Sequence, residues 1–170
     1  MSFDSIIQEH VEEVSDFERD LKLLRGDNPR VALNYRPSIS YDLLLFKEDL
    51  KHCFTSDSFS RSDFHIYIDI IKKVCNFRME ELMDGKRGST GIDFEIYDNP
   101  NQRLKDFFWL ATKNTSPNNQ DLPALGRIGL YNSEDGNGKA PRIFFALGYN
   151  STLHLILCDP EHLVYPRPNK

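Results

Sequence analysis

Residues 142–165 read Arg142-Ile-Phe-Phe-Ala-Leu-Gly-Tyr-Asn-Ser-Thr-Leu-His-Leu-Ile-Leu-Cys-Asp-Pro-Glu-His-Leu-Val-Tyr165 and contain the densest apolar segment of the chain. The apolar run is interrupted at Gly148-Tyr-Asn-Ser151, a combination typical of a turn. We therefore predict two strands, 142–148 and 152–158, that pair as a hairpin. Pro160 then ends the second strand, because proline lacks the N–H group that a sheet needs.

Side chains of a strand point alternately to its two faces, so the second strand has two distinct sides. One side would carry His154, Ile156 and Cys158, and the other Leu153, Leu155 and Leu157. We expect the leucine side to lie in the core. The other side is then either partly open or covered by a helix.

Two further strands are predicted upstream of this hairpin, at 92–97 and 125–131. Residues 92–97 alternate cleanly between apolar and polar, which indicates a strand with one wet face. Between them, 101–112 has helical spacing but also a Phe-Phe-Trp-Leu run that suits a strand. We leave helix and strand open for that segment.

The N-terminal half has helical periodicity instead. Residues 3–24 carry an apolar stripe at steps of four and three opposite an acidic face, and further helices are predicted at 41–54 and 63–84. We expect a short strand at 31–35 and a loop at 36–40. The chain is therefore predicted to be a single α+β domain over 1–170, with a mainly helical part (1–84) and an antiparallel sheet of about four strands (91–165).

Composition narrows the function classes. The formal net charge is −5, with 28% charged and 12% aromatic residues, so the chain can build a core but has no strong basic field for nucleic acid. Its three cysteines are widely spaced, which favours reduced thiols in a cytoplasm. We see no signal peptide and no membrane-spanning run, and we assign neither a cofactor nor a metal.

Catalysis-capable side chains concentrate at the end of the hairpin, in Cys158, Asp159, Glu161 and His162, with His154 upstream. Four interpretations compete: a metal site, a Cys158–His162 nucleophile pair, general acid–base work by His162 or His154, and a turn capped by Asp159. The turn is the interpretation that we favour, because Asp commonly accepts hydrogen bonds from the backbone that follows it.

Cations supply a second set of candidates. If the strands form one sheet, several basic residues could converge on it beside aromatic rings and contact RNA; these are Arg103, Lys105, Lys113, Arg127, Lys139 and Arg142. Lys86 and Arg87 lie in the glycine-rich loop 85–91, which could wrap a phosphate or simply connect a helix to a strand. Scattered surface charges are the alternative explanation for both sets.

The order helix, strand, then strand–hairpin–strand, with Arg142-Ile-Phe-Phe and Leu153-His-Leu-Ile-Leu as paired strands, resembles the sheet of RelE-like bacterial toxins. The resemblance covers residues 91–165 and matches no diagnostic motif. Those proteins cleave messenger RNA on the ribosome with basic and acid–base side chains on that sheet. The resemblance implies that Arg127, Arg142, His154 and His162 are the residues to test.

Two functions follow as hypotheses. The first is a cytoplasmic bacterial protein, toxin-like or accessory to a mobile element, that acts on RNA. Its site would use His154, Asp159, His162 and Arg142, with RNA contacts from Arg127, Lys105, Lys86 and Arg87. The alternative is a non-catalytic module that binds a protein partner, or a second copy of itself, through residues 3–24. Whether the protein is an enzyme stays open.

Overall fold

The computed structural model describes residues 33–46, 54–84, 90–115, 118, 120, 122–131 and 140–166. Its elements are β1 (Ser38–Ser40), α4 (Arg61–Val74), α5 (Met79–Met83), β2 (Asp93–Ile96), α6 (Gln102–Thr112), β3 (Leu125–Gly129), β4 (Arg142–Leu147), a 3-10 turn (Tyr149–Ser151) and β5 (Thr152–Asp159). The predicted α+β class is confirmed. The predicted helix at 3–24 lies outside the described residues, as do Lys86 and Arg87.

The sheet has five strands in the order β1-β5-β4-β3-β2. All neighbours pair antiparallel except β1, which runs parallel to β5. The predicted sheet of about four antiparallel strands is therefore β2 to β5, and the N-terminal half adds a fifth. That fifth strand occupies part of the segment 36–40, for which a loop was predicted, so this prediction was wrong.

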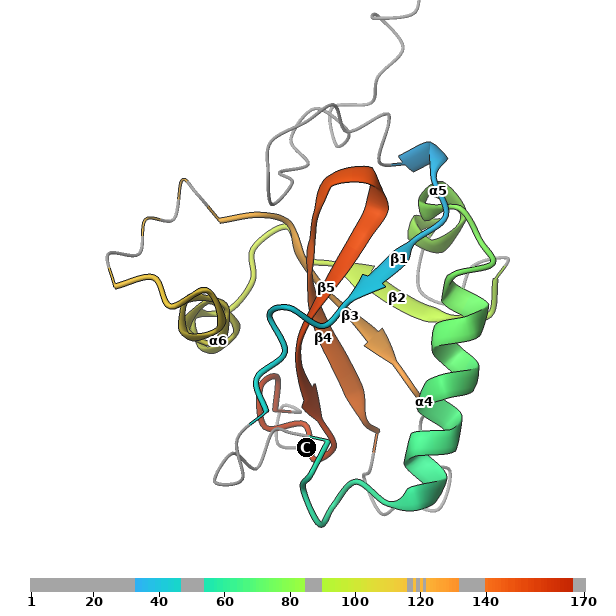
Figure 1. Cartoon of the computed structure of the whole chain (residues 1–170), viewed down its shortest axis with the longest axis horizontal. Helices are drawn as coiled ribbons and strands as arrows, with labels where there is room; N and C mark the ends of the chain where they lie inside the picture. The colour runs from blue at the N-terminus through green and yellow to red at the C-terminus, as the bar shows by residue number, and fades with distance from the viewer. Residues whose placement is uncertain are drawn as a thin grey trace, which may run out of the picture.

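Helices cover both faces of the sheet, with α4 and α5 on one side and α6 on the other (Figure 1). Each side has its own apolar core. The α4-side core includes Tyr67, Ile128, Ile143, Phe145 and Leu155, and the α6-side core includes Leu104, Phe108, Phe144, Ile156 and Leu157. The central hairpin of β4 and β5 is buried on both faces, which explains its continuous apolar sequence.

A β-bulge in β5 overturns the predicted division of that strand into a leucine face and a His/Cys face. Phe144 pairs with Leu157 and Phe145 pairs with Leu155, so Ile156 is an extra residue with no partner of its own in β4. One inserted residue reverses the alternation after it. As a result, Leu157 packs in the α6-side core and Cys158 in the α4-side core.

Local hydrogen bonds set the helix boundaries. Ser60 and Asp63 form a capping box that starts α4. The predicted helix at 63–84 is two helices, because α4 ends at Val74 and α5 begins only at Met79, whose N–H donates to the carbonyl of Tyr35. The predicted helix at 41–54 is wrong for 41–46, which contain a turn closed by a bond from Leu44 N to Tyr41 O.

The segment 101–112, which the sequence left between helix and strand, forms α6. The side chain of Asn101 caps it by accepting from the N–H of Leu104 at 2.9 Å. Lys113 ends it in a left-handed conformation, with φ of 55°. Among the described residues no helix is long and apolar enough to cross a membrane.

Asn101 offers a test of how α6 is held. Its Nδ2 also donates to the carbonyl of Val164 at 2.8 Å, so one side chain both caps the helix and binds the C-terminal segment. Asn101→Ala should lower the free energy of unfolding by about 1–2 kcal/mol, because both bonds are lost. Asn101→Ser should cost less, since a serine can still cap the helix. Urea denaturation measures both, and equal losses would show that capping contributes little.

Candidate charged site on the sheet

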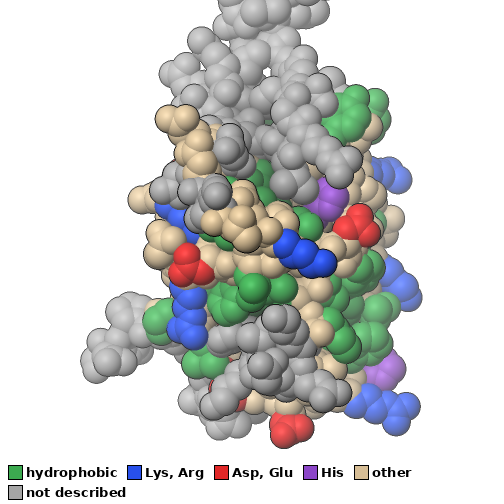
Figure 2. Space-filling view, turned by 60° about the vertical axis from the view of Figure 1, so that its left-hand side comes forward, with side chains coloured by type: hydrophobic (Ala, Val, Ile, Leu, Met, Phe, Trp, Pro, Cys, Tyr) green, Lys and Arg blue, Asp and Glu red, His purple; other side chains and the backbone are tan. Residues whose placement is uncertain are grey.

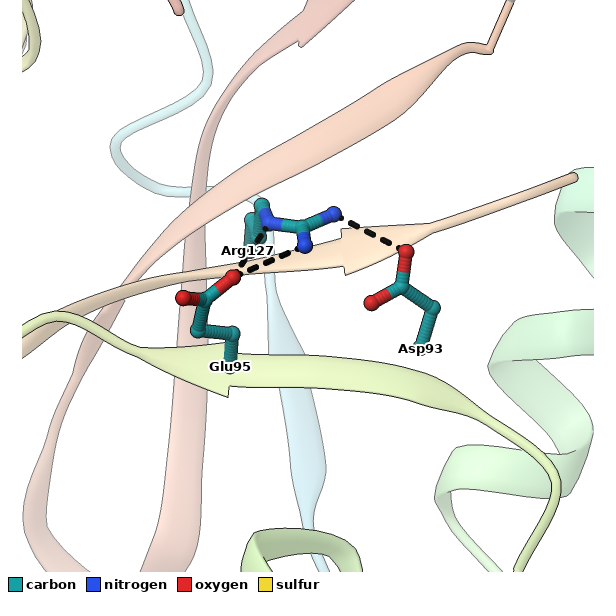
Figure 3. A network of polar contacts seen from close by, with 3 residues as sticks. All are labelled: Asp93, Glu95 and Arg127. Carbon is teal, nitrogen blue, oxygen red and sulfur yellow. Dashed lines mark hydrogen bonds and ion pairs between the residues drawn. The ribbon is translucent and has the colours of Figure 1, made fainter. Parts of the chain in front are cut away.

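Arg127 of β3 is a buried cation on the α6 side of the sheet, with 7% of its surface exposed. Its Nε and Nη2 lie 2.8 Å from Glu95 Oε2, and its Nη1 lies 3.0 Å from Asp93 Oδ2 (Figure 3). Both acids come from β2, the neighbouring strand. The alternation of 92–97 predicted this wet face, and the pairing of Glu95 with Arg127 brings it to the guanidinium.

The two carboxylates compensate for the burial of Arg127. Burial alone lowers the pKa of this guanidinium. The charge of Asp93 and the hydrogen bonds that Arg127 donates to both acids outweigh that effect, so the pKa is raised. Arg127 is therefore a bound cation whose three contacting nitrogens are already used. Its predicted role in binding RNA stays untested, and the geometry assigns it first to holding β2 on β3.

An aromatic stack lies beside this network. The rings of Tyr97 and Tyr165 stack with centroids 4.7 Å apart and planes 7° apart, and Phe144 stacks on Tyr165 at 6.0 Å. Tyr97 follows β2 and Phe144 lies in β4, so the ring of Tyr165 contacts residues on both sides of β3. The Tyr165 hydroxyl accepts from the N–H of Asn101 at 2.7 Å. Sequence reasoning did not single out Tyr97 or Tyr165.

Arg142 begins β4 and lies in one row across the sheet with Gly129, Asp93 and Asp159. It pairs with Asp159 on one side and with Gly129 on the other, and Gly129 pairs with Asp93. Arg142 is half-buried, and no hydrogen bond or ion pair joins its guanidinium to another described residue. Burial, and next the charge of Arg127, lower its pKa. Arginine nevertheless stays charged in proteins, so this guanidinium is available to an anion.

Asp159, the residue opposite Arg142, serves the turn that follows β5. Its carboxylate accepts from the N–H of Leu163 at 2.9 Å and from that of Val164 at 2.8 Å. The favoured interpretation, a turn capped by Asp159, is confirmed. His162 lies within this turn, is 5% exposed and adopts a left-handed backbone with φ of 62°.

The structure does not bring His154 to this site. His154 pairs with Ala146 and with Ser40, near the opposite end of β5, and its ring packs against Gly148. His154 and Asp159 are five positions apart along the strand, which corresponds to roughly 16 Å. The predicted catalytic set thus divides into Arg142, Asp159 and His162 at one end and His154 at the other. Within the described ranges, no three His, Cys, Asp or Glu side chains are placed to hold a metal ion.

Among the residues that the structure describes, the remaining cations do not form a single basic surface. Lys105 lies half-exposed on α6, and Arg103 donates to the carbonyl of Leu163 at 2.7 Å, which helps to hold the C-terminal turn. Figure 2 shows acidic and basic side chains interspersed on the side of the molecule where α6 lies. Any anion would therefore be bound by a local group such as Arg142 and not by a general field.

An open cleft of about 70 Å³ lies next to the row at the ends of β2 and β3. Its lining includes Asp93 and Gly129 from the row and Ile70 and Tyr131 from the α4 side. Arg142 is not part of its lining, so we place the candidate site on the α6 side of the row.

Comparison of the chain with models of protein families, with curated proteins and with solved structures finds no match. The resemblance to RelE-like toxins stays a prediction. The candidate site therefore stands on its geometry alone.

A double-mutant cycle tests the Arg127 network. Arg127→Ala and Glu95→Ala should show a coupling energy of about 2 kcal/mol, because removing one partner leaves the other charge poorly solvated. The control is the exposed pair of Arg78 and Glu80, 3.2 Å apart, whose coupling should stay below about 1 kcal/mol. Equal coupling energies from thermal unfolding of both cycles would contradict the structural role of Arg127.

Proposed function

We propose that this protein binds single-stranded RNA on the α6 side of its sheet, with Arg142 as the phosphate contact. The observation that carries the proposal is the half-buried Arg142 guanidinium, which has no hydrogen bond or ion pair with other described residues. A partly desolvated guanidinium binds phosphate oxygens more strongly than a fully hydrated one, because less water has to be displaced.

The neighbouring aromatic rings support RNA as the ligand. Tyr97 and Tyr165 are both part-exposed, and they lie on the same side of the sheet as Arg142. Proteins that bind single strands combine cations that contact the backbone with aromatic rings on which bases stack. An arginine beside a tyrosine pair offers both kinds of contact, on a small scale.

The charge balance limits how strong this binding can be. The chain carries a net charge of −5, and three carboxylates surround the two arginines of the site. We therefore expect one or two phosphate contacts. The logarithm of the binding constant should fall with the logarithm of salt concentration with a slope of about −0.7 for each contact.

Arg142→Gln should weaken binding of a short unstructured oligoribonucleotide at least tenfold, since the phosphate contact is lost. Arg142→Lys should lose less, because the charge remains while the bidentate fork is removed. Arg61→Gln, an exposed arginine at the start of α4, is the control and should bind as the wild type does. Fluorescence anisotropy measures all three. Equal affinities for wild type and Arg142→Gln would exclude this site.

The toxin-like part of the proposal concerns cleavage of the bound RNA, and His162 is its candidate acid–base group because it follows Asp159 at the Arg142 end of β5. His162→Asn should lower any RNA-cleaving activity at least a hundredfold, and asparagine tolerates the left-handed backbone there. His154→Asn, at the other end of β5, should leave the rate unchanged. The reverse pattern in a gel-based cleavage assay would refute the assignment.

A further inference from the structure

The ring of Tyr165 covers part of the surface on which RNA is proposed to bind. It stacks on Tyr97 with centroids 4.7 Å and planes 7° apart, and on Phe144 with centroids 6.0 Å and planes 16° apart. Tyr97 follows β2 and Phe144 lies in β4, so Tyr165 covers the face of Tyr97 that is turned toward β4. A flat side chain of the chain itself thus takes the position that a base takes on an aromatic platform.

The covered face of Tyr97 is the one turned toward the strand of Arg142. Arg142 and Phe144 are two positions apart in β4, so their side chains point to the same side of the sheet. Burial raises the pKa of Tyr97, and the nearby guanidinium groups of Arg127 and Arg142 oppose that rise. A nucleotide whose base stacks on this face of Tyr97 therefore has the Arg142 guanidinium within reach of its phosphate.

The attachment of Tyr165 allows its ring to leave without unpacking the core. The residue before it, Val164, is fully buried in the α6-side core, and its N–H donates to Asp159 at 2.8 Å. The ring of Tyr165 is part-exposed, and its hydroxyl accepts a hydrogen bond from the N–H of Asn101 at 2.7 Å. Rotation about the side-chain torsions of Tyr165 would break this bond and the stack while Val164 stays in place.

We propose that Tyr165 is an autoinhibitory residue, which occupies the face of Tyr97 on which an RNA base stacks and leaves that face when RNA binds. This inference rests on the proposed function and adds how the same site is regulated. Every base has a π-face, so the exchange of a tyrosine ring for a base replaces one stack by another. The affinity for RNA is then reduced by the fraction of molecules in which Tyr165 covers Tyr97.

Removing the ring tests the competition. Tyr165→Ala should bind the short unstructured oligoribonucleotide about threefold more tightly or better, because Tyr97 is then always available. Tyr97→Ala should bind it about threefold more weakly or worse, because the stacking platform is lost. Tyr149→Ala is the matched control and should bind as the wild type does, since Tyr149 is an exposed tyrosine at the other end of the hairpin. Fluorescence anisotropy with each full chain measures the three affinities.

A second measurement uses the wild type and does not depend on the folding of a variant. The N–H of Asn101 donates to the Tyr165 hydroxyl, so departure of the ring exposes that amide to exchange with solvent. Saturating oligoribonucleotide should therefore speed the exchange of the Asn101 amide about fivefold or more in an NMR exchange experiment. The amide of Leu104, which donates to the side chain of Asn101, is the control and should not exchange faster.

The outcomes separate this inference from the proposed function. If RNA binding depends on Arg142, but Tyr165→Ala binds more weakly than the wild type or the Asn101 amide does not exchange faster with RNA, then autoinhibition is wrong and RNA binding stands. If the oligoribonucleotide binds neither the wild type nor Tyr165→Ala, or binds both independently of Arg142, the proposed function fails and the inference fails with it.

Discussion

The structure depends on the burial of one hairpin from both sides. β4 and β5 lie inside the sheet, and their side chains pack against α6 on one face and against α4 and α5 on the other. Phe144 and Phe145, adjacent in sequence, belong to different cores. Burying each such side chain contributes about 1.5–3 kcal/mol to the stability of the fold. The helices on both faces therefore pack against this pair of strands.

The bulge at Ile156 decides which side chains of the hairpin face each of the two layers of helices. Without it, Leu157 would face α4 and Cys158 would face α6; with it, a leucine fills the α6-side core and the smaller cysteine lies against α4. The same shift sets the side chain of Asp159 where it can cap the next turn. That turn returns the chain over the sheet, so that Tyr165 reaches Tyr97 and Phe144.

Charged groups gather where this packing ends. On the α6 side of the sheet, the apolar core around Phe144 gives way to Arg127, Arg142 and their acidic neighbours. Arg127 is satisfied within the fold by Asp93 and Glu95. Arg142 is not, and this difference between two arginines on adjacent strands is the physical basis for assigning them different roles.

The sequence by itself determined the α+β class, the hairpin at 142–158, the wet face of 92–97 and the turn after Asp159, because these follow from local periodicity, turn residues and proline. Only the tertiary structure decided which side chains meet. Arg127 is 32 residues from Glu95, and Asn101 is 64 residues from Tyr165. The alternation of apolar and polar residues predicts which face of the sheet a side chain occupies. It does not predict which strand pairs with this one, or in which register. A single bulge reverses even the face that a side chain takes. The grouping of His154 with Asp159 and His162 was wrong for a different reason, because His154 and Asp159 lie near opposite ends of β5.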